Sequence, residues 1–328
     1  MKTAKTRLRI APLVLLAIAG ITASATSLAQ TNTKSQCFSN EGLPAELQKK
    51  SEKYLLEALD TEALFTLVGA LKPMSSSFYD RRVSTSIPRM SEEEATLVIA
   101  ELGSRRASKM TDEQKAKLAE AKSAADRFSA LRDVDDLRRI VSTWTCGDEI
   151  HGDIVHFATP HAGNRHVEGV LFSRPALTDM IQRKEKFFSR WSITPHSNPI
   201  EALMAVEYAR DASRFAGYGY LFGYPDEAVR FFVDSSIHQD MTGDFVTRDF
   251  RAIPTFQRET GQFTYAVPKG TDVTEADLRL KERAGAILSA YKVRRAQYVG
   301  PGKRGVAAML RDWFCPTDNE CSPANAAV

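Results

Sequence analysis

Residues 149–173 read EIHGDIVHFATPHAGNRHVEGVLFS, and this stretch decides the fold class that we expect. Its two flanks, 150–158 and 165–173, are rich in Ile, Val, Phe and Leu, and the residues between them, 159–164, are typical of a turn. The stretch therefore predicts a β-hairpin. A hairpin set among helices, without alternating β and α units, indicates an α+β fold.

Helical patterns precede and follow this hairpin. Apolar side chains recur every three to four residues in these segments, and some segments open with a capping pair, such as Ser91 with Glu94 and Asn198 with Glu201. We expect one helix or a helical pair over 44–71, and helices over 91–103, 111–143, 175–190, 198–215, 225–233, 274–297 and 306–314. A break near 133–136 could interrupt the third of these.

Three further segments are predicted to be non-helical. Serine, arginine and proline make 74–90 resemble a connecting loop, and regularly placed glycines make 217–224 resemble a turn. We expect a short antiparallel meander over about 244–267, with strands over 244–250, 253–258 and 262–267. The predicted chain is therefore mostly helical in its first half, then continues with the hairpin, helices, the meander and C-terminal helices.

The first 29 residues are typical of a bacterial secretory signal peptide. Four basic side chains precede an apolar run over 10–21, and Ser27-Leu28-Ala29 predicts cleavage after Ala29. The apolar run is shorter than the roughly 20 residues that a membrane-spanning helix needs. We therefore expect no stable transmembrane anchor after cleavage, and a destination in the periplasm or outside the cell.

For the mature chain we expect two packed subdomains with loose ends. The predicted segments are a flexible N-terminus over 30–43, a helical subdomain over 44–146, an α+β subdomain over 147–315 and a flexible tail over 316–328. We expect the two subdomains to pack as one unit, because a chain of this length can bury a large core.

Net charge excludes one class of partner. The formal charge is +3, but residues 1–29 contain four basic and no acidic side chains, so 40 basic and 41 acidic side chains remain after cleavage, a formal charge of −1. Binding to nucleic acid depends on a basic surface that neutralises phosphates. We therefore expect an envelope or extracellular ligand or protein as partner and no nucleic acid.

Four cysteines in an exported chain predict disulfides. Their spacing favours one pair of Cys315 with Cys321 and a second of Cys37 with Cys146, although the sequence alone does not decide among the three pairings. A zinc site made of these cysteines is the lesser alternative, because the chain has no C-x-x-C pair.

The hairpin contains four of the six histidines, at positions 151, 156, 161 and 166. A turn centred on His161 would place His156 opposite His166, on the face that also carries Glu168. Two histidines and a carboxylate can hold a metal ion, and zinc is the metal that we would expect first. Asp153 and Glu149 are the candidate bases. The competing interpretation, which we favour, is that backbone carbonyls and nearby carboxylates satisfy these histidines.

Two other segments carry candidate binding residues. In 300–305, Gly302, Lys303 and Arg304 precede a helix and could hold an anion; the alternative is an exposed turn. The segment 217–224 could form an aromatic wall for a sugar or peptide, whereas the interpretation that we favour is core packing. The aromatic side chains in question are Tyr218, Tyr220, Phe222 and Tyr224.

Two functions fit these features. The first, which we rank slightly ahead, is an exported protein that binds a ligand or partner without catalysis. The second is a secreted hydrolase-like enzyme that uses the histidine hairpin with a metal or a histidine. The sequence has neither the G-x-S-x-G nor the H-E-x-x-H motif that would favour an enzyme.

Overall fold

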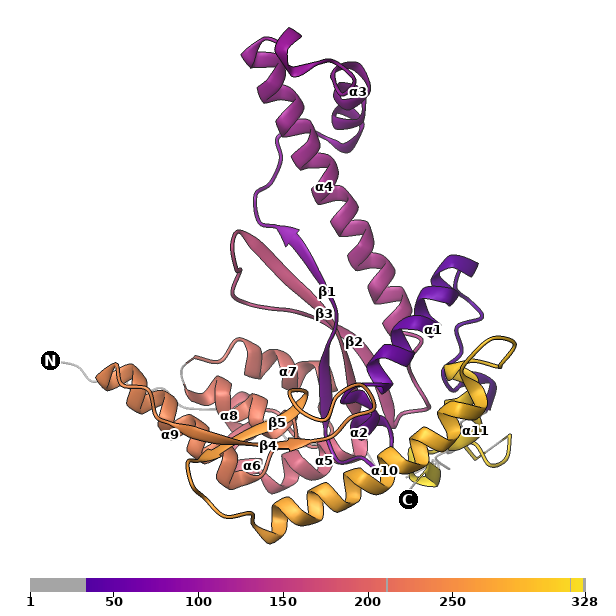
Figure 1. Ribbon diagram of the computed structural model, residues 1–328, viewed down its shortest axis with the longest axis vertical. Helices are drawn as coiled ribbons and strands as arrows, with labels where there is room; N and C mark the ends of the chain where they lie inside the picture. The colour runs from indigo at the N-terminus through magenta and orange to yellow at the C-terminus, as the bar shows by residue number, and fades with distance from the viewer. Residues whose placement is uncertain (1–33, 211, 319, 327–328) are drawn as a thin grey trace, which may run out of the picture. The chain divides into compact units, whose positions relative to one another are not determined.

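Two antiparallel sheets lie among helices in the part of the chain that the computed structural model describes, residues 34–210, 212–318 and 320–326 (Figure 1). This confirms the α+β class. The first sheet has the strand order β1-β3-β2, and the second pairs β4 with β5. The strands are β1 (Met74–Ser84), β2 (Ile150–His156), β3 (Asn164–Ser173), β4 (Arg248–Ile253) and β5 (Phe263–Pro268).

Most helices begin where the sequence predicts. The α-helices are α1 (Ala45–Leu59), α2 (Ala63–Leu67), α3 (Glu92–Leu102), α4 (Asp112–Val141), α5 (Arg174–Arg183), α6 (Glu185–Phe188), α7 (Pro199–Glu207), α8 (Ala212–Leu221), α9 (Asp226–Thr242), α10 (Glu275–Tyr298) and α11 (Val306–Phe314). Short 3-10 helices are η1 (Lys34–Gln36), η2 (Ala107–Lys109), η3 (Ser189–Trp191) and η4 (Pro323–Ala326). Capping boxes at Ser91, Asn198 and Thr274 explain three of the accurate starts, because each satisfies free amides of the first turn.

Helix ends differ more from expectation. The segment 44–71 is a helical pair, and α4 continues through 133–136 without the break that the sequence suggested. Val134 and Leu137 of α4 are buried in the main core, and this packing favours a continuous helix. The helix predicted over 225–233 continues to Thr242, where Gly243 ends it with a φ of 79°.

The prediction of a loop over 74–90 is wrong, because most of this segment is β1. Its backbone pairs with β3, from Met74 opposite Phe172 to Ser84 opposite Asn164. Two register shifts interrupt the pairing, and Tyr79 has a φ of 61°. Irregularities of this kind break the alternation of side chains that identifies a strand in a sequence. The backbone hydrogen bonds to β3 therefore stabilise β1, although its sequence does not show the alternating pattern of a strand.

The β1-β3-β2 sheet separates two hydrophobic cores. On one face, Ile154 and Val167 join a core that includes side chains of α4, which lies beside the sheet in Figure 1. On the other face, Val155 and Val170 join a core built with α5, α7 and α8. Strand β1 comes from the predicted helical subdomain and β3 from the predicted α+β subdomain, so both contribute to one sheet. The described residues belong to one compact unit.

The glycine-punctuated segment 217–224 is mostly helical, which corrects the prediction of a turn there. The helix expected over 198–215 ends at Glu207, and α8 continues to Leu221. A Cβ atom on Gly217 would lie 2.5 Å from Val206 Cγ2, and one on Gly219 would lie 2.7 Å from Val229 Cγ2. The two glycines therefore let α8 pack closely against α7 and α9. The same glycines led to the incorrect prediction of a turn.

This close packing predicts opposite effects for two glycine-to-alanine changes. Gly219→Ala should destabilise the protein by about 1 to 3 kcal/mol, because the added methyl group overlaps Val229. Gly285→Ala, in the exposed part of α10, should stabilise it by roughly 0.5 to 1 kcal/mol, because no atom lies within 4 Å of the new Cβ and alanine favours helix. Urea unfolding of both variants measures the difference. Equal effects at the two positions would contradict this account of α8.

The predicted three-stranded meander is a two-stranded sheet. The expected middle strand, 253–258, turns back on itself after β4: the Thr255 amide donates to the carbonyl oxygen of Arg258 at 2.8 Å. The hydroxyl of Thr255 also accepts from the Arg258 amide at 3.1 Å. Hydrogen bonds made within the segment leave no ladder for a third strand.

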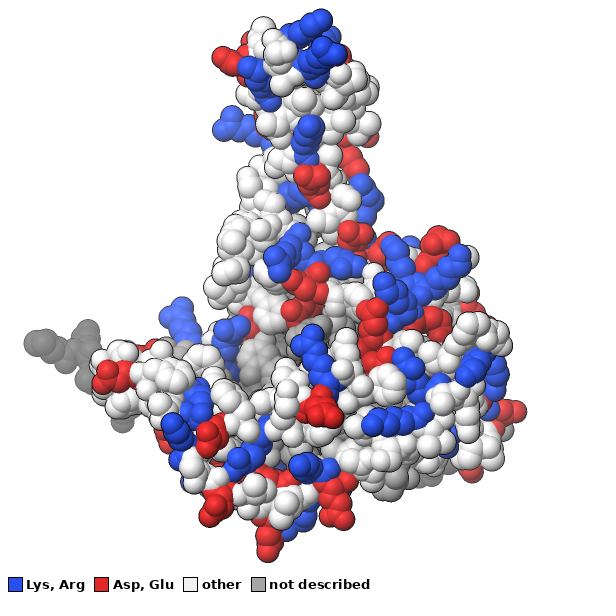
Figure 2. All heavy atoms as spheres, in the orientation of Figure 1, with Lys and Arg blue, Asp and Glu red and all other residues white. Residues whose placement is uncertain are grey.

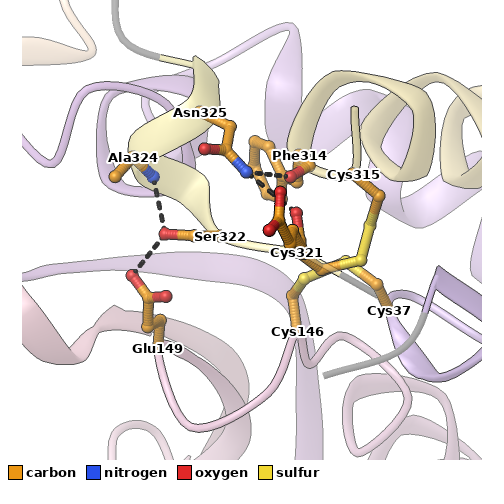
Figure 3. The surroundings of a disulfide bond; sticks show 10 residues. Cys37, Cys146, Glu149, Phe314, Cys315, Cys321, Ser322, Ala324 and Asn325 are labelled. Atoms are coloured by element: carbon orange, nitrogen blue, oxygen red, sulfur yellow. Dashed lines mark hydrogen bonds between the residues drawn. A yellow bond between two sulfur atoms is a disulfide. The ribbon is translucent and has the colours of Figure 1, made fainter. Parts of the chain in front are cut away.

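Both disulfides favoured by the spacing are present, Cys37–Cys146 and Cys315–Cys321. They lie next to each other, since the sulfur atoms of Cys37, Cys146 and Cys315 are within 4.8 Å of one another (Figure 3). Disulfides indicate an oxidising compartment outside the cytoplasm. The predicted signal peptide, residues 1–29, lies outside the described residues. Within the described ranges, no helix has both the length and the apolar character needed to cross a membrane.

The two segments predicted to be flexible are attached to the core over their described parts. Near the N-terminus, Phe38 is buried beside Phe314, with ring centroids 5.8 Å apart. Near the C-terminus, the Ser322 hydroxyl donates to the Glu149 carboxylate at 2.9 Å, and the Asn325 side chain donates to the carbonyl oxygen of Phe314 at 2.8 Å (Figure 3). The adjacent disulfides bring these contacts together.

Candidate functional site

The histidine hairpin is present, but its register differs by one residue from the prediction. His156 lies opposite Val167, not opposite His166. Successive side chains of a strand point to opposite faces, so this shift places His156 on the face away from His166 and Glu168. The structure therefore does not bring these three candidate zinc ligands together on one face of the hairpin.

The turn also lies later in the chain than predicted. Ala162 and Gly163 have positive φ angles of 47° and 74°, and His161 and Asn164 exchange two backbone hydrogen bonds across them, at 2.8 and 2.9 Å. Positive φ at both central positions is typical of a two-residue hairpin turn. The turn is thus centred between Ala162 and Gly163 instead of on His161.

The other hairpin candidates have partners within the chain. The Nδ1 atom of His166 lies 2.8 Å from an oxygen of Asp80, a residue of β1, and His151 Nε2 lies 3.5 Å from Asp153. Burial opposes ionisation of Asp153, but the adjacent His151 side chain and the hydrogen bond from the Ile154 amide outweigh it and lower the pKa of this carboxyl group. A lowered pKa makes Asp153 a weak base.

Side chains of the types that bind metal ions also converge outside the hairpin. Among the described residues, three or more ligand-type side chains converge only at Cys37, Cys146 and Cys315. Each of these sulfur atoms is in a disulfide, whereas a zinc ligand must be a thiolate. In the part of the chain that the structure describes, the hairpin therefore contributes no histidine or carboxylate to a group of three metal-ligand side chains. Glu149, the second candidate base, is the partner of Ser322 and serves the C-terminal attachment.

The glycine-rich loop before α11 already faces an anion, the carboxylate of Glu52 from α1. Its Oε2 atom accepts from the Val306 amide at 2.8 Å, and a Cβ atom on Gly305 would lie 2.7 Å from that oxygen. Lys303 donates to the carbonyl oxygen of Ala296, and Arg304 pairs with Asp312 at 2.5 Å. Gly302 lies in the turn that the Lys303 amide closes by donating to the carbonyl oxygen of Gly300 at 3.1 Å. Lys303 and Arg304 thus both contact groups of the chain itself.

The aromatic segment leads to a pocket, which we call the aromatic pocket. It has a volume of about 320 Å³ and lies between α8, α9 and the β4-β5 hairpin. The helical spacing of α8 turns one row of its side chains toward this space. The rings at the pocket are those of Phe215, Tyr218, Phe222, Tyr224, Phe232, Phe250 and Tyr265.

The predicted aromatic wall is therefore present in part. Tyr218, Phe222 and Tyr224 line the pocket, whereas Tyr220 points elsewhere and packs edge-on against Phe187, with ring centroids 5.1 Å apart. Helix α8 separates Tyr218 from Tyr220, because residues two positions apart are rotated by about 200° around an α-helix. Phe222 and Tyr224 follow the end of α8 at Leu221.

A buried charge network holds Tyr218 at the pocket. The side chain of Glu207 is fully buried and accepts from Arg214 at 2.8 and 3.0 Å, from the Ala158 amide at 2.7 Å and from the Tyr218 hydroxyl. Burial and the adjacent carboxylate raise the pKa of Tyr218. Sequence reasoning missed this network, because its members lie on different elements, α7, α8 and the segment after β2, and match no local motif.

The pocket offers ring surface more than polar groups. Tyr265 donates its hydroxyl hydrogen to Asp277, as Tyr218 does to Glu207, so both phenols are already satisfied. At the mouth, Phe215, Phe232 and Phe250 remain partly exposed. Clustered exposed aromatic residues around a concave site are typical of a binding surface.

These observations make the aromatic pocket the candidate functional site. Comparisons with models of protein families, with curated proteins and with solved structures gave no match for this chain. The choice of site therefore rests on its geometry and chemistry.

Proposed function

We propose that this chain is an exported, non-catalytic ligand-binding protein and that the aromatic pocket is its binding site. The observation that carries the proposal is a pocket of about 320 Å³ walled by rings from two helices and a β-hairpin. The predicted signal peptide and the two disulfides support export. The ligand that fits is a small, uncharged molecule with an aromatic or similarly flat apolar body.

Three properties of the pocket favour this ligand. Its volume is at the lower end of the range of about 300 to 1,000 Å³ that is usual for small-molecule sites. The rings offer stacking and edge-to-face contacts, each of which adds about 0.5 to 1.5 kcal/mol beyond simple burial. Tyr218 and Tyr265 are held by the buried carboxylates of Glu207 and Asp277, so the ligand has to order few side chains when it binds.

The surface charge supports the same class of partner. On the face shown in Figure 2, lysine and arginine side chains are interspersed with aspartate and glutamate, and neither sign forms a continuous stripe. Binding to nucleic acid depends on a basic stripe or patch. A neutral apolar ligand does not require a basic patch on the surface.

The proposal can be tested with the uncharged fluorescent probe N-phenyl-1-naphthylamine and the oxidised mature protein. We expect saturable binding with one site, and at least about a tenfold loss of affinity in Phe250→Ala, because this change removes one wall of the pocket. Phe250 is 63% exposed, so the change should have little effect on folding.

Phe245→Ala is the matched control. Phe245 is also 63% exposed but is not part of the pocket wall, so its loss should leave probe affinity within about twofold of the unchanged protein. Equal affinities of the two variants, or absence of saturable binding, would refute the proposed site. Circular dichroism of both variants establishes that the fold is retained.

A further inference from the structure

A second pocket lies on the opposite side of the histidine hairpin from His166. It has a volume of about 330 Å³ and is bounded by the end of β1, by α4 and by the β2-β3 hairpin. Val83, Val134 and Val167 form a buried apolar floor. Arg127 and Arg165 supply its charged groups, and no aspartate or glutamate is among its lining residues. We call it the arginine pocket.

Both guanidinium groups are positioned by backbone oxygen atoms. Arg127 Nε donates to the carbonyl oxygen of Ser84 at 3.2 Å, and Arg165 Nη1 donates to those of Phe157 and Ala158 at 2.5 and 3.0 Å. A carbonyl group orients the side chain but does not neutralise its charge. Within the described ranges, neither arginine has a carboxylate at ion-pair distance, and the Nη atoms of Arg127 have no hydrogen-bond partner.

The ionisation of His156, which also lines the pocket, agrees with an excess of positive charge. Burial lowers the pKa of His156, and the nearby charges of Arg138 and Arg165 lower it further, while Asp153 acts in the opposite direction. The imidazole is therefore favoured in its neutral form. It can still donate one N–H group to a ligand, without adding to the charge.

From this arrangement we infer that the arginine pocket binds an amphiphilic monoanion, with its head group between Arg127 and Arg165 and a short apolar body on the valine floor. Guanidinium groups suit this role because they stay charged and present parallel N–H donors to carboxylate, sulfate or phosphate oxygens. The inference concerns a different site and a different ligand class from the aromatic pocket, so either proposal can fail without the other.

Calorimetric titration of the oxidised mature protein with octyl sulfate, octylammonium and octanol, each below its micelle concentration, tests the inference. We expect octyl sulfate to bind at least about tenfold more tightly than octylammonium at low ionic strength, with octanol between them, and the preference to fall as salt is added. Arg127→Met should weaken octyl sulfate binding by about tenfold or more. Equal affinities for the two charged probes would overturn the inference.

Arg139→Met is the matched control, because Arg139 is an exposed arginine of the same helix that does not line the pocket. It should leave octyl sulfate affinity unchanged. Leu131→Glu provides a second variant that does not depend on Arg127: it places a carboxylate at a partly exposed position of the pocket wall. This variant should bind octyl sulfate less tightly, and octylammonium more tightly, than the unchanged protein does. Unchanged octyl sulfate binding in either pocket variant would contradict the assignment.

Discussion

Replacement of both Cys37 and Cys146 by serine should lower the free energy of unfolding by about 4 to 5 kcal/mol. This disulfide joins residues 109 positions apart, so its loss releases a long loop in the unfolded chain. It also detaches the segment that carries Phe38 from the core beside Trp144 and Phe314. A loss of this size is a large part of the total stability of a typical protein, which is about 5 to 15 kcal/mol. Urea unfolding of the oxidised proteins measures it.

The second disulfide provides the matched control for this prediction. Cys315 and Cys321 are only 6 positions apart, and the same loop model gives a loss of roughly 2 kcal/mol when both become serine. The ratio of the two losses is therefore informative. Equal losses would mean that loop closure does not set the contribution of these disulfides, and that local packing around the adjacent sulfur atoms does.

Glu207→Ala is the other change with a large expected effect, a destabilisation of about 3 kcal/mol or more. The fully buried carboxylate receives hydrogen bonds from Arg214, Tyr218 and the Ala158 amide, and its removal leaves these donors unsatisfied. Because Tyr218 lines the aromatic pocket, the same change should weaken binding of N-phenyl-1-naphthylamine. Thermal unfolding and the fluorescence titration measure the two effects.

Glu201→Ala, on the same helix, is the control for Glu207→Ala. Glu201 belongs to the capping box at the start of α7 and is exposed, so its loss should cost no more than about 1 kcal/mol. A comparable cost at the two positions would show that the buried network contributes no more than an ordinary cap. Arg214→Met should be at least as harmful as Glu207→Ala, since it leaves the buried carboxylate without its cation.

The sequence indicated which aromatic residues form part of the candidate site, but not that they line a pocket. The aromatic residues of 217–224 stand out in the sequence, yet glycine suggested a turn, and core packing was the favoured interpretation. Gly217 and Gly219 instead allow two valines of neighbouring helices to approach α8. The pocket exists only because α9 and the β4-β5 hairpin meet α8 there, and no local pattern specifies such a meeting.

The histidine series shows how sensitive a site can be to one unit of register. A register that differs by one residue from the prediction places His156 at the arginine pocket, on the face away from His166. The partner of His166 is Asp80 of β1. This strand was not predicted from the sequence, because its register shifts break the alternation of side chains. Likewise, the anion that the loop before α11 accommodates is Glu52, which is 254 residues from Val306.

The α+β class, the positions where most helices begin and the favoured pairing of the four cysteines could be predicted from the sequence alone. These features depend on side chains that contact the backbone within a few residues, or on covalent chemistry, so they are visible locally. Four features became visible only in the folded chain: the register of the hairpin, the pairing of β1, the helical state of α8 and the two pockets. Each of these arises from packing between distant segments, where the energy of burial and pairing overrides local preference.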